Sequence, residues 1–364
     1  MEVRATVRAP SNIALIKYWG KSDEDLIIPL NSSLSLTTDI DEVYTHTEVV
    51  ASPALEGIEL RLNGKEDKLT RRIIRLVEEV RKLLPEQQRT WGIRINTHNN
   101  FPTAAGMASS ASGFAALACA LTQAFSLHEQ FPGQFSALAR LGSGSASRSM
   151  YGGVVEWQHG SSHETSIAVQ VFEQAHWPEL ELVLVLISTA SKEVSSTSGM
   201  KSSADTSMDL QDRINRRVPE RLERIKSAIA AKDFPTVATI TMTDSDDLHH
   251  ICETSDPQIV YLTYKSHAVK DVVRSLNAEG VKAGFTFDAG PNAFIVTLRQ
   301  HRELVLERLL ALFKVKNYEE GLNRQAKETI SAQKYSELAQ TAILEIQGIM
   351  SLKVSARGAY RLEN

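Results

Sequence analysis

The residues best suited to chemistry in this 364-residue chain are an aspartate and an arginine in two separate small-residue segments. Asp288 ends the run Phe-Thr-Phe-Asp, and the Ala-Gly pair after it leaves open space beside the carboxylate. Such a carboxylate can orient a substrate hydroxyl, or it can cap the turn before Pro291. Arg148 follows five small residues, and its planar guanidinium is suited to a carboxylate or a phosphate. A surface ion pair is the structural alternative for Arg148.

A loop of small side chains after Phe101 is suited to phosphate. It reads Pro-Thr-Ala-Ala-Gly-Met-Ala-Ser-Ser-Ala-Ser-Gly and leads into an Ala-rich helix expected over residues 111–125. The first N–H groups and the positive dipole end of that helix would favour a polyanion on the loop. The loop is neither a Walker loop nor a dinucleotide fingerprint, because it has no Gly-Lys-Ser/Thr ending and no Gly-x-Gly-x-x-Gly run. A tight turn into a packed helix explains the composition equally well.

Length and composition predict an ordinary globular protein. A chain of 364 residues exceeds the roughly 250 to 300 residues of a single core, which favours two domains or one domain with a large extension. The net charge of −4 gives no electrostatic reason to expect a nucleic-acid partner. Two cysteines, Cys119 and Cys252, cannot form a disulfide framework and suit a reducing cytoplasm, and Cys119 is expected to fill the core. No signal peptide is evident, and the longest apolar run, 182–187, is far short of the ~20 residues of a membrane span.

The pattern of apolar residues predicts a β-rich first third followed by mixed elements. Strands are expected at 3–8, 34–38, 58–62, 92–96, 151–158, 180–188, 284–288 and 292–297, and helices at 70–84, 111–125, 134–141, 210–231, 234–247, 261–279 and 302–313. Residues 188–207 are rich in Ser and Thr, which predicts a linker or an active-site loop. The expected fold is α+β, with an N-terminal domain at 1–180 and a C-terminal domain at 181–364.

Four separated motifs resemble those of the diphosphomevalonate decarboxylases, a family of the GHMP kinase superfamily. They are residues 9–21 (Ala-Pro-Ser-Asn-Ile-Ala-Leu-Ile-Lys-Tyr-Trp-Gly-Lys), 29–35, 142–149 and 285–292, while the small-residue loop resembles the second motif of the superfamily. The resemblance runs from about Val7 to about Pro291. It implies a two-domain GHMP-kinase-like fold with the active site in the cleft between the domains, and it implies a homodimer.

The activity implied by this resemblance is ATP-dependent decarboxylation of mevalonate 5-diphosphate to isopentenyl diphosphate, with Mg²⁺ and with phosphorylation of the 3-hydroxyl before loss of CO₂. A phosphomevalonate decarboxylase or a mevalonate-type 3-kinase of the same superfamily is the alternative. A binding protein on this scaffold would be expected to have lost Asp288, Arg148 or the Ser109-Ser110 pair, and all of them are present.

The resemblance also assigns roles to residues. Asp288 would present the 3-hydroxyl, Arg148 would hold the substrate carboxylate, and Lys21 would face the diphosphate; these three are the expected catalytic residues. Substrate would also contact Asn12, Tyr18, Trp19, Gly20, Arg72 (or its neighbour Arg71), Ser143, Gly144, Ser145, Ala146, Ser147, Ser196, Thr197 and Met200. ATP would contact Pro102, Ala104, Ala105, Gly106, Met107, Ala108, Ser109 and Ser110, and either serine could make an indirect contact with Mg²⁺.

Three details of the sequence bear on these roles. Some bacterial relatives carry an arginine where this chain has Thr197, which leaves Lys21, with help from Arg71 or Arg72, to neutralise the diphosphate. Lys17 lies in the same segment as Lys21, with plain solvent exposure as the alternative to a role in the site. His249 and His250 with Asp244, Asp246 and Asp247 resemble a metal cluster, but adjacent helical residues point ~100° apart, so packing or surface polarity is the expected role.

Overall fold

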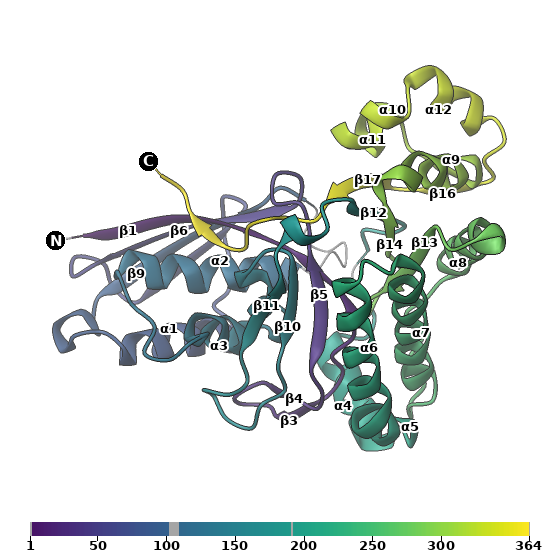
Figure 1. Ribbon diagram of the computed structural model, residues 1–364. Helices are drawn as coiled ribbons and strands as arrows, with labels where there is room; N and C mark the ends of the chain where they lie inside the picture. The colour runs from purple at the N-terminus through teal and green to yellow at the C-terminus, as the bar shows by residue number, and fades with distance from the viewer. Residues whose placement is uncertain (1, 102–108, 191, 364) are drawn as a thin grey trace.

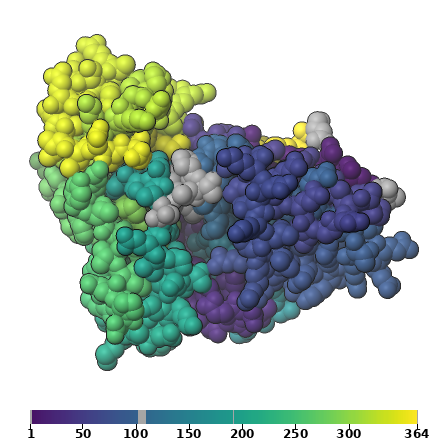
Figure 2. Space-filling model, turned by 180° about the vertical axis from the view of Figure 1, so that it is seen from behind, coloured from purple at the N-terminus to yellow at the C-terminus, as the bar shows by residue number. Residues whose placement is uncertain are grey.

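The computed structural model describes residues 2–101, 109–190 and 192–363. They form two parts that lie side by side, an N-terminal part in purple and blue and a C-terminal part in green and yellow (Figure 1). In the space-filling view the yellow C-terminal helices project beyond the rest of the molecule (Figure 2). The expected α+β fold is confirmed. None of the helices in the described ranges combines the length and the apolar character needed to cross a bilayer.

A six-stranded sheet in the order β18-β1-β6-β9-β7-β8 is the base of the N-terminal part. Strand β1 alternates buried and more exposed residues, as a half-buried strand does. The Asn63-Gly64 turn has positive φ at both residues and joins β7 to β8 as a hairpin. Three helices share an apolar core with this sheet. The elements are β1 Val3–Pro10, β6 Tyr44–Ser52, β7 Ile58–Leu62, β8 Lys65–Glu66, β9 Gly92–Asn99 and β18 Tyr360–Arg361, with α1 Arg71–Lys82, α2 Ser109–Ala124 and α3 Gln134–Gly142.

A second sheet, in the order β11-β10-β5-β2, lies between the first sheet and the C-terminal part (Figure 1). A small hairpin, β3–β4, lies between β2 and β5 in the chain, and a 3-10 segment, η2, links α3 to β10. Both segments contain residues that the sequence predicted to bind substrate, such as Lys21 in β3 and Arg148 in η2. The elements are β2 Asn12–Ile16, β3 Lys21–Asp23, β4 Ile28–Pro29, β5 Ser33–Thr37, η2 Gly144–Met150, β10 Val154–Trp157 and β11 Ala168–Phe172.

The C-terminal part is built on a four-stranded antiparallel sheet in the order β13-β14-β12-β17, with helices packed against it. Its strands are β12 Leu180–Leu186, β13 Ala283–Phe287, β14 Ala293–Leu298 and β17 Gly348–Lys353, and β15 Phe313–Val315 pairs separately with β16 Leu344–Ile346. Its helices are α4 Ser196–Thr206, α5 Asp209–Asp212, the π-helical turn η4 Arg213–Arg217, α6 Val218–Ala230, α7 Phe234–Glu253, α8 Tyr264–Leu276, α9 Arg302–Leu312, α10 Tyr318–Gly321, α11 Arg324–Thr329 and α12 Ala332–Ala339. Further 3-10 turns are Glu86–Gln88, Gln174–His176, Asn277–Glu279 and Arg299–His301.

One apolar core joins the two parts. Ile13 of β2 and Leu36 of β5 belong to the same buried cluster as Leu184 of β12, Val237 of α7 and Phe294 of β14. Strand β18 also returns from the end of the described chain to pair with β1. The walls of a site at this junction are therefore held by continuous packing, since closely packed interiors leave few voids.

Most expected elements are present with small shifts at their ends, and one region differs. Residues 188–207 were expected to be a linker or loop, but Ser196–Thr206 form α4. The Ser195 hydroxyl caps this helix by accepting a hydrogen bond from the backbone N–H of Ser198. Gly199 brings α4 against Trp19 and Tyr261, so close that a Cβ there would lie 2.4 Å from the Tyr261 hydroxyl. Tertiary packing therefore forms a helix where the sequence lacks an apolar period.

Candidate active site

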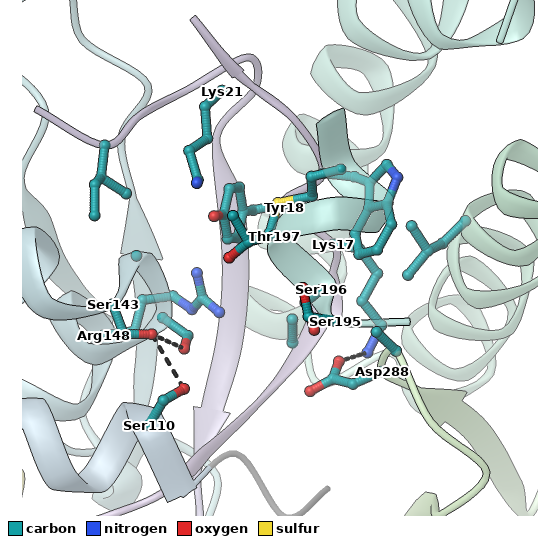
Figure 3. Close-up of a pocket in the computed structure, with 18 of the residues that line it drawn as sticks. Lys17, Tyr18, Lys21, Ser110, Ser143, Arg148, Ser195, Ser196, Thr197 and Asp288 are labelled. Carbon is teal, nitrogen blue, oxygen red and sulfur yellow. Dashed lines mark hydrogen bonds and ion pairs between the residues drawn. The ribbon is translucent and has the colours of Figure 1, made fainter. Parts of the chain in front are cut away.

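A cavity of about 400 Å³ at the junction collects side chains from both parts (Figure 3). One wall comes from the chain after β2, from α1, from the start of α2 and from η2, and the other from α4, from α7 and from the turn after β13. Most of the residues predicted from the sequence line this cavity. They are Tyr18, Trp19, Lys21, Arg72, Ser110, Ser143, Gly144, Ser145, Arg148, Ser196, Thr197, Met200 and Asp288.

Asp288 and Lys17 form the central ion pair of the cavity. The Lys17 ammonium donates to Asp288 Oδ1 at 2.6 Å, and the lysine side chain is 2% exposed whereas the aspartate is 37% exposed (Figure 3). Burial disfavours ionisation of Asp288, but Lys17, Lys192 and Arg148 together outweigh it, so the pKa of the carboxyl lies below its ordinary value. Burial lowers the pKa of Lys17, against the attraction of Asp288. The simple exposure considered for Lys17 from the sequence is wrong.

Arg148 is buried, and its guanidinium is oriented by two polar side chains. Its Nη1 donates to the Ser33 hydroxyl at 2.7 Å, and its Nε donates to Asn12 Oδ1 at 3.3 Å. Burial lowers the pKa of Arg148 to about 10, against the attraction of Asp288 and Tyr18. Asn12, predicted to contact substrate, lies behind the arginine and also donates to the Ser145 carbonyl and the Ser149 hydroxyl. The structure thus gives Asn12 the contacts of a residue that supports the guanidinium.

A cluster of hydroxyl groups lies at the start of α2, in the same cavity as Arg148. The Ser143 hydroxyl donates to the Ser110 hydroxyl at 3.2 Å and lies 3.3 Å from the Ser145 hydroxyl (Figure 3). Gly144 lets the chain between these serines lie against Trp157, because a Cβ there would lie 2.6 Å from the Trp157 ring. Four residues predicted to contact substrate lie outside the cavity lining, namely Asn12, Gly20, Ala146 and Ser147. Ala146 is part of the apolar core, and the Ser147 hydroxyl donates to the Gly144 carbonyl within η2.

The β3–β4 hairpin carries Lys21 at the edge of the cavity. The Lys21 ammonium donates to Glu24 Oε2 at 2.6 Å, and the Glu24 side chain is 59% exposed. Gly20 precedes the hairpin with φ of +89°, where a Cβ would meet Leu30 at 2.4 Å. Gly20 therefore gives the chain its turn and leaves the contact to its neighbours.

The residues predicted on α1 and α4 line opposite walls of the cavity, and one hydrogen bond joins the two walls. Arg72 at the start of α1 donates to the Thr197 hydroxyl at 2.7 Å, whereas its neighbour Arg71 is exposed. The Lys192 ammonium donates to the Ser196 hydroxyl at 3.4 Å and, like Ser195, lines the cavity. Met200 packs in a small apolar cluster with Trp19. Lys192 and Ser195 were missed because the Ser/Thr-rich segment shows no helical period.

A second, smaller cavity of about 200 Å³ lies beside the first, between α2 and the six-stranded sheet. Its walls are mainly apolar, with Leu60, Ile73, Ile95, Phe114 and Leu117 among its lining residues. Ser109 also lines this cavity, and Ser110 lines both cavities. The other predicted ATP contacts, Pro102 and 104–108, lie outside the described residues.

The acidic residues near His249 and His250 are engaged by basic side chains, as the packing interpretation predicted. Asp244 and Asp247 accept hydrogen bonds from Arg213 inside the C-terminal part, and Asp246 accepts from Lys270. Burial, with the charge of Lys270, lowers the pKa of His249 to about 3. Within the described ranges no group of three or more His, Cys, Asp or Glu residues is placed to hold a metal ion. Cys119 is buried, as expected.

Comparison with known proteins agrees with this geometry. A family profile described as the diphosphomevalonate decarboxylase-like N-terminal domain matches residues 9–168, and the mevalonate 5-diphosphate decarboxylase C-terminal domain matches residues 182–357. The chain belongs to the diphosphomevalonate decarboxylase family. It is 43% identical to the Schizosaccharomyces pombe diphosphomevalonate decarboxylase over 85% of this chain and 83% of the relative. It is 40% identical to the human one over 80% and 76% of the two chains.

Solved structures of the family have the same architecture. Mevalonate diphosphate decarboxylase from Trypanosoma brucei matches with a TM-score of 0.90 and 37% identity over 99% of this chain and 98% of that one. The enzyme from Enterococcus faecalis matches with a TM-score of 0.81 and 32% identity over 100% of both chains. A further family structure, in complex with MVAPP, AMPPCP and magnesium, matches with a TM-score of 0.82 and 32% identity, again over 100% of both chains.

Proposed function

We propose that this protein catalyses the ATP-dependent decarboxylation of mevalonate 5-diphosphate, which yields isopentenyl diphosphate, ADP, phosphate and CO₂. The observation that supports this most strongly is the arrangement of one cavity, where the Asp288 carboxylate and the Arg148 guanidinium meet beside Ser110, which also lines the apolar neighbour. A substrate bound there would have its hydroxyl at Asp288 and its carboxylate at Arg148. A nucleotide with its base in the apolar cavity would bring its phosphates to Ser110.

Asp288 and Lys17 act on the substrate hydroxyl in this proposal. A carboxylate with a pKa below its ordinary value is a weak base, so Asp288 mainly accepts a hydrogen bond from the 3-hydroxyl and aligns its oxygen for attack on the γ-phosphoryl group. As the new O–P bond forms and the bond from the γ-phosphorus to ADP breaks, the hydroxyl proton passes to Asp288. Lys17 keeps that carboxylate ionised and fixed. Once phosphorylated, the tertiary oxygen leaves as phosphate. The electron pair of the substrate's C–CO₂⁻ bond then forms the new double bond, and CO₂ is released.

The remaining charged groups bind the substrate. The Arg148 fork holds the carboxylate in the position from which it is lost, because two-point binding fixes a planar anion. Lys21 faces the 5-diphosphate, with Arg72 close to Thr197 on the other side. The 3-hydroxyl, the carboxylate and the diphosphate are thus each met by a different side chain.

The lining residues are compatible with ATP and Mg²⁺. Mg²⁺ commonly binds through one or two carboxylates together with substrate phosphates and water. Here the Asp288 carboxylate and the Ser110 hydroxyl supply oxygen atoms, with an indirect role for Ser109 or Ser110, and Lys192 supplies a nearby positive charge. ATP with Mg²⁺ provides the phosphoryl group that makes the 3-oxygen a leaving group.

The proposal also covers the domain boundaries, the cellular location, the partners and the assembly state. The N-terminal domain spans 1–180 and the C-terminal domain 181–364, and the site lies between them. The protein acts in the cytoplasm without membrane or nucleic-acid partners, and it forms a homodimer, as the family resemblance implies. Multi-angle light scattering of the purified chain measures the assembly state directly.

One coupled assay tests the function. The purified protein is supplied with ATP, Mg²⁺ and either mevalonate 5-diphosphate or mevalonate 5-phosphate, and both ADP and CO₂ are measured. We expect equal amounts of ADP and CO₂ and a strong preference for the diphosphate. ADP without CO₂ would identify a 3-kinase instead, and preference for the monophosphate would identify a phosphomevalonate decarboxylase.

A further inference from the structure

Two adjacent residues of α7 accept backbone hydrogen bonds from the two segments that carry Lys17 and Asp288. Asp244 Oδ2 accepts a hydrogen bond from the backbone N–H of Lys17 at 2.7 Å. The Ser245 hydroxyl accepts one from the backbone N–H of Phe287, the residue before Asp288, at 3.0 Å. Both side chains are fully buried. Because Asp244 and Ser245 are neighbours on one helix, α7 is a common support for two segments that are far apart in the sequence.

Arg213 binds the backbone carbonyl of Lys17, whereas Asp244 binds its backbone N–H. Its Nη2 donates to the Lys17 carbonyl at 3.0 Å and to Asp244 Oδ2 at 3.0 Å, and its Nη1 donates to Asp244 Oδ1 at 2.9 Å. One charged pair therefore binds both backbone polar groups of Lys17. Arg213 begins the π-helical turn between α5 and α6, a distortion that is frequent at functional sites.

This arrangement is an inefficient way to stabilise a core. Removing two charges from water is expensive, and a well-packed apolar replacement of a buried ion pair is often neutral or stabilising. Burial disfavours ionisation of Asp244, but Arg213 and Arg221 outweigh it and hold the pKa of Asp244 below its ordinary value. The carboxylate stays charged at neutral pH and presents a fixed acceptor to Lys17. Core packing alone does not require the buried Arg213–Asp244 pair, whereas a role in binding the Lys17 backbone explains why it is there.

We propose that Arg213, Asp244 and Ser245 are positioning residues that hold the Lys17 ammonium against Asp288 for phosphoryl transfer. This inference rests on the proposed function of the cavity. The three residues act through Lys17 and Phe287, and they are absent from the described lining of the cavity. A misplacement of about 1 Å at a reacting group can cost ~10²-fold in rate. Residues that fix the backbone of Lys17 and Phe287 can therefore affect kcat without touching the substrate.

The Asp244→Ala variant tests the proposal, with Arg221→Ala as the matched control. Arg221 Nη1 donates to the same carboxylates, Asp244 at 2.8 Å and Asp247 at 2.7 Å. Its loss weakens the same network but leaves in place the contacts of Arg213 and Asp244 with the Lys17 backbone. We measure kcat, both KM values and Tm. In Asp244→Ala, kcat should fall at least about tenfold while both KM values change less than about threefold. In Arg221→Ala, Tm should fall while kcat stays within about twofold.

Two further variants keep the test decisive if Asp244→Ala does not fold. Asp244→Asn retains an oxygen that can accept from the Lys17 N–H, so it should recover most of the lost kcat. Ser245→Ala removes the anchor at Phe287 and should lower kcat about threefold or more, at nearly unchanged KM. The proposal is overturned if Asp244→Ala or Ser245→Ala keeps wild-type kcat, or if Arg221→Ala loses as much kcat as Asp244→Ala. The variants are scored on ADP release relative to wild type, which the decarboxylase and the alternative 3-kinase share, whereas CO₂ release by the wild type tests the proposed function separately.

Discussion

Lys17 and Lys21 lie four residues apart in one segment, and each ammonium contacts a carboxylate oxygen at 2.6 Å, yet their surroundings differ. Both backbone polar groups of Lys17 are bound by Arg213 and Asp244. Lys21 lies in a hairpin, and its partner Glu24 is exposed and only three residues away. An incoming phosphate can replace Glu24 more readily than it can replace Asp288. The comparison teaches that a fixed pair suits the reacting hydroxyl, whereas an exchangeable pair suits the recognition of an anion.

The largest effect is expected at the fixed pair. Asp288→Asn keeps the shape of the side chain but removes the charge that aligns the hydroxyl, so turnover should fall at least ~10²-fold with nearly unchanged ATP affinity. Asp246→Asn is a matched control, because Asp246 is 42% exposed and pairs with buried Lys270 at 2.7 Å outside the cavity. ADP release and nucleotide binding are measured for both. An Asp288→Asn variant within a few fold of wild type would remove Asp288 from the mechanism.

The exchangeable pair should affect binding instead of turnover. Lys21→Ala removes a charge-assisted contact of ~1.5 to 3 kcal/mol, so the KM for the diphosphate substrate should rise tenfold or more, and the KM for the monophosphate much less. Lys82→Ala is the control, because Lys82 contacts Glu79 at 2.6 Å in an exposed pair of the same spacing on α1. Steady-state KM values for both substrates are measured. Equal losses for the two substrates would show that Lys21 does not recognise the terminal phosphate.

The two lysines can also be distinguished by pH. Burial, which outweighs the attraction of Asp288, lowers the pKa of Lys17 from 10.5, so Lys17 loses its proton, and Asp288 its partner, as pH rises through a value below 10.5. We therefore expect an alkaline decline of kcat with its midpoint below 10.5. The pKa of Asp288 is held below 3.8, so the decline from its protonation lies below that pH.

Lys17→Arg tests this assignment, because a guanidinium keeps its proton to a higher pH than an ammonium in the same surroundings. The alkaline decline of kcat should move upward or disappear in the residual activity of this variant. The other groups that affect Lys17 and Asp288 electrostatically are Asp244, Arg148, Lys192 and His249. An unchanged decline in Lys17→Arg would assign it to Arg148 or Lys192, the two of these groups that lose a proton at alkaline pH.

The smallest effect is expected from Glu24→Gln. The substrate diphosphate must displace Glu24 from Lys21. The Lys21 side chain is 4% exposed, but Glu24 is 59% exposed, and an ion pair open to solvent is worth only ~0 to 1 kcal/mol. Removing the glutamate charge should therefore lower the KM for the diphosphate by up to about fivefold without changing kcat. A higher KM would mean that Glu24 orients Lys21 instead of competing for it.

Local signals in the sequence predicted the elements that depend on neighbouring residues. The strand expected at 58–62 is present and ends at the Asn63-Gly64 turn, whose residues tolerate positive φ. The helix expected at 70–84 follows from its apolar period, and in the structure Thr70 caps it. Helix α4 was missed because its position depends on Gly199 packing against Trp19 and Tyr261, which are distant in the sequence. Propensity is a weak guide where tertiary packing decides.

The candidate site divides in the same way. The small residues around Arg148 and Asp288 marked both segments as sites, and the structure brings both side chains to one cavity. The environment of Lys17 could not be predicted, because its backbone partner Asp244 and its side-chain partner Asp288 are 227 and 271 residues away. The pattern of apolar residues around Lys17 and Lys21 does not show which of the two lysines is buried.

The return of β18 to β1 has a consequence for how the chain reaches its folded state. Val7 pairs with Arg361, so completing the six-stranded sheet requires a contact between opposite ends of the described chain. Such non-local contacts raise the contact order and slow folding, because loop closure must precede the gain from pairing. During synthesis the part of the β1 edge at Val7 and Arg8 stays unpaired until Tyr360 and Arg361 emerge from the ribosome. An N-terminal half produced alone would keep that edge exposed, and unpaired strand edges are sites of aggregation.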